Sequence, residues 1–136
     1  MPAASRRAPA RTDPPMKLQL DSQEGMAITG YGEGWFAVNE RRYAASIVVM
    51  PGRLPQDWGG GFAALSVSDF EMLRALAPDV VLIGTGARQR FPDPRLLSPL
   101  IEARIGFEIM DSPAACRTYN ILMAEGRRVA AALLLD

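Results

Sequence analysis

Two loop segments carry the polar residues of this chain that could do chemistry. Gly84-Thr85-Gly86 follows an apolar run and leads to Arg88, and Asp111-Ser112 stands before Pro113 and a helical pattern that contains Arg117. Glycine lets a backbone approach a ligand closely, and a helix N-terminus offers free N–H groups to an anion. Together with the two arginines, these residues predict a binding site for a small anion or metabolite.

The same residues also have a purely structural interpretation. Gly84 and Gly86 can simply turn the chain, and Ser112 can cap the following helix, a contribution of about 1 kcal/mol. The Gly-Thr-Gly triplet matches neither the spacing of a phosphate loop nor that of a dinucleotide fingerprint. Geometry separates the functional alternatives, because a small ligand needs a concave pocket, whereas a flat or convex edge suits a partner protein.

The composition removes the usual catalytic groups. The chain has no histidine, the commonest general base and metal ligand, and its single cysteine, Cys116, excludes an intramolecular disulfide and a thiolate cluster. We therefore expect no catalytic residue, no metal and no cofactor, and we favour a non-enzymatic protein. Cys116 falls in the first turn of a predicted helix, where it is either a small apolar core residue or a thiol activated by the helix dipole and Arg117.

Charge and hydropathy limit the partners and the location. Fifteen basic residues balance fifteen acidic ones, which gives no reason to expect nucleic acid as a partner. No apolar run is long enough for a transmembrane helix. Residues 1–15 are rich in proline and arginine and predict a disordered tail, or alternatively a transit peptide, before a single domain over residues 16–136. A bacterial cytoplasmic location follows from the first interpretation and a mitochondrial one from the second, and the oligomeric state is not indicated.

Apolar runs separated by helical patterns predict the elements that position these loops. We expect a strand over Arg42–Met50 and further buried strands at Val80–Ile83, Phe107–Met110 and Val129–Leu135. The alternation predicts right-handed crossovers and a mixed, largely parallel sheet in an α/β fold. The loops after Met50, Ile83 and Met110 would then share one rim of the sheet, and the direction of the last strand stays open.

Capping signals mark the predicted helices. Ser68 and Glu71 have capping-box spacing, Ser98 precedes a proline, and a helix over Ala114–Glu125 stops at Gly126. Tyr119 shares a face of that helix with apolar residues and is expected in the core with a partner for its hydroxyl.

The N-terminal half predicts a hairpin and a loop. Met26–Thr29 and Trp35–Val38 flank a glycine-rich connection, Asn39-Glu40 is a two-residue turn, and Lys17–Leu20 is a candidate edge strand. Pro51–Gly61 is too rich in proline and glycine for a helix or a central strand and is expected to be a loop. Trp58 within it either packs down and tethers the loop or adds a contact surface to the rim.

A collinear set of motifs resembles a known family. The motifs are Ile83-Gly84-Thr85-Gly86, Gly106-Phe107-Glu108-Ile109-Met110-Asp111, Ala114-Ala115-Cys116-Arg117-Thr118-Tyr119-Asn120 and Glu125-Gly126-Arg127-Arg128-Val129-Ala130-Ala131-Ala132-Leu133. They resemble the small Mth938-like (DUF498-like) proteins of unknown function, which include the mitochondrial respiratory complex I assembly factor 3, over about Met26–Leu135. The resemblance implies a three-layer β/α fold with a β-ribbon and a non-enzymatic role with a protein partner in complex I assembly. It brings no established site residues.

Overall fold

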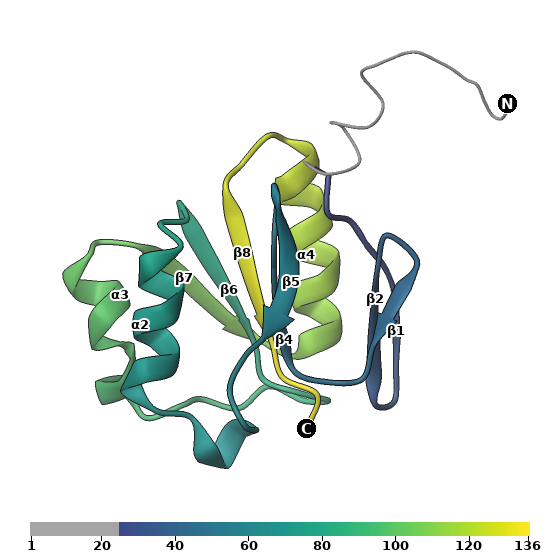
Figure 1. Ribbon diagram of the computed structural model, residues 1–136. Helices are drawn as coiled ribbons and strands as arrows, with labels where there is room; N and C mark the ends of the chain where they lie inside the picture. The colour runs from purple at the N-terminus through teal and green to yellow at the C-terminus, as the bar shows by residue number, and fades with distance from the viewer. Residues whose placement is uncertain (1–24) are drawn as a thin grey trace, which may run out of the picture.

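The computed structural model describes residues 25–136, so the strand predicted at Lys17–Leu20 lies outside the described residues (Figure 1). The strands in this part of the chain are β1 (Ile28–Gly32), β2 (Trp35–Val38), β3 (Arg41–Tyr43), β4 (Ile47–Met50), β5 (Arg53–Asp57), β6 (Val80–Gly84), β7 (Gly106–Met110) and β8 (Val129–Leu133). The helices are α2 (Val67–Ala75), α3 (Ser98–Glu102) and α4 (Ser112–Ala124), with 3₁₀ turns η2 (Phe62–Ala64) and η3 (Pro94–Leu97).

The described chain forms three layers around a five-stranded mixed sheet of order β5-β4-β8-β6-β7. Strands β6, β7 and β8 are parallel to one another, and β4 is antiparallel to both β8 and β5. Helices α2 and α3 cover one face, and α4 with the antiparallel ribbon β1-β2-β3 covers the other (Figure 1). The predicted α/β class with a mixed sheet and an N-terminal ribbon is therefore confirmed.

The sheet separates two apolar cores, and the alternation of side chains along β8 connects them. Val129, Ala131 and Leu133 pack on the α4 side, whereas Ala130 and Ala132 pack on the side of α2 and α3. All five residues of β8 are buried, as the wholly apolar run predicted. β8 enters parallel to β6, which settles the direction that the sequence left open.

The rim of the sheet differs from the predicted one in one strand. β4 runs opposite to β6, β7 and β8. The turn after Met50 therefore lies at the opposite end of the strands from the loops after Ile83 and Met110, and the prediction that it lies beside them is wrong. The chain instead reverses into β5, within the stretch expected to be only a loop, and β5 runs in the direction of β6. Pro55 is compatible with this strand because β5 is at the edge of the sheet, where a missing N–H is tolerated.

The single strand predicted over Arg42–Met50 is also wrong. The chain breaks between Tyr43 and Ile47, so that β3 belongs to the ribbon and β4 to the large sheet. The Asn39-Glu40 turn is confirmed, since both residues have positive φ (49° and 70°) between β2 and β3 as a tight hairpin turn requires.

The helix signals were displaced by one or two residues. α2 uses a capping box made by Ser66 and Asp69 in place of Ser68 and Glu71, and α3 contains Ser98 as its first residue. Gly126 follows the end of α4 with φ +84°, the left-handed conformation expected there.

Candidate functional site

The two predicted loops meet at the carboxyl ends of β6 and β7, and the hydroxyl of Ser112 connects them. The Gly86 N–H donates to Ser112 Oγ at 2.9 Å, and Ser112 Oγ donates to the Leu134 carbonyl at 2.7 Å. The Ser112 N–H donates to the Gly86 carbonyl at 2.8 Å. Only 3% of Ser112 is exposed, so this side chain joins three segments of the rim from inside the fold.

Asp111, and not Ser112, caps helix α4. Its Oδ1 accepts from the Ala114 N–H at 2.7 Å, and its carbonyl accepts from the Ala115 N–H at 3.0 Å. Ser112 is already the first helical residue, which is why its hydroxyl is free to reach Gly86 and Leu134. Pro113 has no N–H, so every backbone donor in the first turn of α4 is used within the protein and none is left for an anion.

The glycines at this point allow close packing. A Cβ on Gly84 would lie 2.8 Å from Ser112 Oγ and 2.9 Å from Ser112 Cα, closer than real side chains come. Gly86 has φ +99°, and a Cβ there would overlap the backbone of Asp136. Glycine is therefore required at both positions, because the backbone there packs directly against Ser112 and Asp136.

Thr85 is fully buried and its hydroxyl serves its own loop. Thr85 Oγ1 accepts from the Arg90 N–H at 2.9 Å and lies 2.8 Å from the Arg88 carbonyl and 3.2 Å from the Met110 carbonyl, to which its single proton can be donated. The Thr85 N–H donates to the Met110 carbonyl at 2.9 Å. The loop is thus a closed turn bound to the end of β7.

Arg90, which shares its loop with the predicted site residue Arg88, is the basic residue that organises the rim. Its Nε and Nη2 donate to the Thr85 carbonyl at 3.1 and 2.8 Å, and its guanidinium stacks 4.3 Å from the ring centre of Phe62. Nη2 also lies 3.7 Å from Asp136 Oδ1, and the Asp136 carboxylate accepts from the Phe62 N–H. In the sequence, Arg88 and Arg90 simply flank Gln89 in the same loop, which does not distinguish one arginine from the other.

Exposed residues of the same loop face outward. Arg88 is exposed, and Phe91 is 69% exposed, an unusual position for a phenylalanine. Arg117 lies elsewhere, because its Nη1 donates to the Tyr31 hydroxyl at 2.9 Å and joins α4 to the ribbon. The structure therefore brings together the two loops and separates Arg117 from Arg88.

Trp58 packs into the core as the tether interpretation requires. It is 2% exposed, its Nε1 donates to the Asp69 carbonyl at 3.0 Å, and its ring meets Phe70 edge-to-face with centroids 5.6 Å apart. It anchors the segment after β5 to helix α2 and offers no surface of its own.

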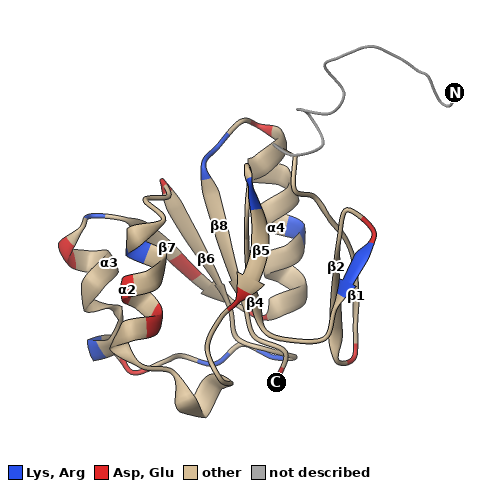
Figure 2. Cartoon of the chain, viewed as in Figure 1, with Lys and Arg blue, Asp and Glu red and all other residues tan. Residues whose placement is uncertain are grey.

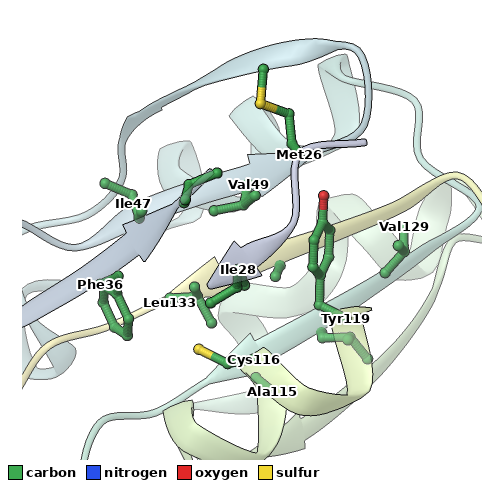
Figure 3. Packing of buried hydrophobic residues seen from close by; sticks show 13 residues of the cluster. Met26, Ile28, Phe36, Ile47, Val49, Ala115, Cys116, Tyr119, Val129 and Leu133 are labelled. Atoms are coloured by element: carbon green, nitrogen blue, oxygen red, sulfur yellow. The ribbon is translucent and has the colours of Figure 1, made fainter. Parts of the chain in front are cut away.

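Two residues of α4 with reactive groups are buried against the ribbon (Figure 3). Cys116 is 1% exposed, and burial raises the pKa of its thiol to about 12, which opposes the activated-thiol alternative. Burial also raises the pKa of Tyr119. The expected partner for the Tyr119 hydroxyl is not found among residues 25–136.

Two surface hollows flank the sheet, and neither is lined by the loops after β6 and β7. A hollow of about 360 Å³ at the rim is lined by Ala45, Ser46, Asp57, Gly59, Gly60, Gly61, Leu135 and Asp136. A hollow of about 600 Å³ at the opposite edge is lined by Gly25, Pro51, Gly52, Met123, Ala124, Gly126, Arg127 and Arg128. Within residues 25–136, no cluster of cysteine and carboxylate side chains could hold a metal ion. No helix in that part of the chain has the length and apolar character needed to cross a bilayer.

Comparison with known proteins places these features in a family context. The family described as "Protein of unknown function (DUF498/DUF598)" matches residues 28–134. A Bos taurus protein named NADH dehydrogenase (ubiquinone) 1 alpha subcomplex assembly factor 3 is 32% identical over 119 residues, which are 86% of this chain and 65% of the relative. The match thus spans less than two thirds of that relative's own length.

Solved bacterial structures share the fold. A crystal structure of a Bordetella parapertussis protein has a TM-score of 0.75 and 43% identity, covering 81% of this chain and 95% of that one. The solution structure of a Bordetella pertussis protein described as a Mth938-like domain has a TM-score of 0.67 and 33% identity, covering 95% of this chain and 93% of that one.

Proposed function

The chain belongs to the DUF498/DUF598 family, as its motifs predict, and we propose on this basis that it is a non-enzymatic interaction protein that helps to assemble respiratory complex I. The supporting relative is the bovine protein that is named as an assembly factor of NADH dehydrogenase. Assembly factors of this kind act by binding other proteins, so the question for the structure is which surface binds.

The binding surface that we propose is the outer side of the loop after β6. Its inner side is closed, because Thr85, Gly86 and Arg90 bond to residues of the same rim. Its outer side presents Arg88 and Phe91 on a backbone that these bonds hold in place. Arginine and aromatic side chains are enriched at protein interfaces, and a pre-ordered surface loses little entropy on binding.

The alternative function, binding of a small anion or metabolite, finds little support in the geometry. The loops after β6 and β7 line neither hollow, and the N–H groups at the start of α4 are bonded to Gly86 and Asp111. The single observation that favours a partner surface over a ligand pocket is this internal saturation of the rim beside the exposed Phe91.

We assign the protein to the bacterial cytoplasm as part of the same proposal. The identity to the Bordetella parapertussis protein, 43%, exceeds the 32% identity to the bovine relative. Cell fractionation with an antibody to the chain tests the location, and recovery in another compartment would oppose it.

Affinity capture from a native lysate of the source cells tests the function. The wild-type chain should recover subunits of the NADH:quinone oxidoreductase, and Phe91→Ala should reduce their recovery about tenfold if Phe91 is an interface anchor. Leu54→Ala is the matched control, because Leu54 is an apolar residue of β5 that is 76% exposed and lies outside the loop after β6.

Two results would contradict the proposal. Absence of every oxidoreductase subunit and assembly protein from the wild-type capture would remove the assembly role. Equal recovery with Phe91→Ala and wild-type chain would move the binding surface away from this loop.

A further inference from the structure

Strand β7 forms an open edge of the large sheet. In the strand order it pairs only with β6, and the opposite edge strand, β5, carries a proline that β7 lacks. An open strand edge presents unpaired backbone groups to another chain, and natural sheets often protect such edges with proline or charge. The open edge of Gly106–Met110 therefore raises the question of which strand, if any, pairs with it.

The hydrogen bonds of the rim show which residues of β7 have backbone groups that face away from β6. The Met110 carbonyl faces β6, because it accepts from the Thr85 N–H at 2.9 Å. Backbone groups alternate along a strand, so those of Phe107 and Ile109 face away from β6. The Ile109 carbonyl is indeed reached from outside, by Gln89 Nε2 at 2.9 Å. Gln89 belongs to the loop that carries Arg88 and Phe91, so this edge is continuous with the surface proposed above.

Glu108 lies between Phe107 and Ile109, the two residues whose backbone N–H and carbonyl groups face away from β6. Phe107 and Ile109 pack toward the core of α2 and α3, so Glu108 points to the other face, where it is exposed (red on β7 in Figure 2). None of the hydrogen bonds or ion pairs within residues 25–136 involves its carboxylate. Its charge is thus free to select what lies opposite.

A second copy of the chain is a poor occupant of this edge. The antiparallel register that uses both outward residues of each strand sets Phe107 opposite the other copy's Ile109 and Glu108 opposite Glu108. Like charges directly opposite each other destabilise a strand pair, whereas opposite charges stabilise it. The residue types therefore oppose self-pairing and favour a strand with a basic residue at the facing position.

We infer that β7 accepts an extended strand of a partner protein by β-addition, with a lysine or arginine of that strand opposite Glu108. This inference rests on the proposed interaction function and names the kind of segment that the partner supplies. Main-chain bonds to both backbone groups of Phe107 and to the Ile109 N–H give the affinity, since the Ile109 carbonyl already accepts from Gln89 Nε2, and the charge at Glu108 gives the selectivity.

Two synthetic peptides of residues 105–111 test the inference, one with the natural sequence and one carrying Glu108→Lys. We expect the Glu108→Lys peptide to shift and protect the amide signals of Phe107 and Ile109 in the whole chain, and to bind about fivefold more tightly than the natural peptide. The protein variant Glu108→Lys should reverse the preference. Since Glu108 is exposed, this variant should keep the fold, which the remaining amide signals report.

Unchanged Phe107 and Ile109 amides at about 1 mM of either peptide would overturn the inference. Equal binding of both peptides would also overturn it, because the charge of Glu108 would then select nothing. Either failure leaves the lysate capture unaffected, so it would refute the β7 edge and not the assembly role.

Discussion

The hydroxyl of Ser112 joins the loop after β6 to the segment after β8. Removing this one oxygen atom should lower the free energy of unfolding by more than the loss of an exposed hydroxyl would. Ser112→Ala would leave the Gly86 N–H and the Leu134 carbonyl unpaired in a site that is 3% exposed. We expect a loss of about 2–4 kcal/mol in the free energy of unfolding, measured by urea denaturation. Ser68→Ala serves as the control, since Ser68 is exposed, and a loss no larger than in that variant would contradict the bridging role.

The buried thiol of Cys116 predicts a pH dependence of stability. Burial raises its pKa to about 12, against about 8.5 in an unfolded chain. The two states bind the same proton below pH 8.5, but at higher pH the unfolded state releases it first. The unfolding free energy should therefore fall as pH rises toward 12, by up to about 1.4 kcal/mol per pH unit from this group.

Comparison with Cys116→Ala isolates this contribution. Stability measured from pH 8 to 11 should fall less steeply in the variant, whatever its stability at pH 8, and parallel curves would show that the thiol ionises without unfolding. Native wild-type chain should also react slowly with a thiol reagent at pH 8 and quickly in denaturant, because the thiol is 1% exposed.

The sequence patterns predicted that the loops after β6 and β7 would meet, but they wrongly placed Arg117 and the turn after Met50 beside them and did not show what each residue does there. Asp111 and Ser112 are both good caps, and only the backbone, which makes Ser112 the first helical residue, assigns the cap to Asp111. Arg88 and Arg90 are equivalent in the sequence, and the nearby Phe62 and Asp136 that distinguish Arg90 come from distant segments.

At the scale of elements, one amide fastens the ribbon to helix α4. Asn120 Oδ1 accepts from the Ile28 N–H at 2.8 Å, and Asn120 Nδ2 donates to the Ile28 carbonyl at 2.7 Å, so the side chain pairs with β1 as a neighbouring strand would. Asn120→Ala should cost about 2–3 kcal/mol of stability and speed hydrogen exchange at the Ile28 amide.

Ile121→Ala is the control for that measurement, because Ile121 is the next residue on α4 and is 59% exposed. It should change stability by less than about 0.5 kcal/mol. Equal exchange at Ile28 in both variants would mean that the Asn120 amide does not hold β1 in place.

Local sequence patterns predicted most helices and strands, and the errors arose where pairing between strands determines the structure. β6, β8 and α4 follow from apolar runs and from Gly126, which act within a few residues. β5 has a composition of loop type and becomes a strand only because β4 offers it an edge. The division of Arg42–Met50 between two sheets likewise depends on which strands β3 and β4 meet.

For the molecule as a whole, the three crossovers β5-α2-β6, β6-α3-β7 and β7-α4-β8 bring their exit segments to one rim, where contacts join those segments to one another. Arg90 joins the loop after β6 to Phe62 of η2 and to Asp136 after β8. A single side chain thus links parts of the sequence that follow three different strands.

Arg90→Ala should therefore loosen the rim as a unit. We expect faster hydrogen exchange at the Phe62 amide and a loss of about 1–3 kcal/mol, because the Thr85 carbonyl loses a charged donor and Phe62 loses its stacked guanidinium. Arg90→Lys keeps the charge but not the paired donors or the planar stack, so it should recover only part of the loss. If the rim also orients Phe91, Arg90→Ala should weaken capture of oxidoreductase subunits although Phe91 is intact. Unchanged exchange at Phe62 together with unchanged capture would mean that the exit segments are independent of one another.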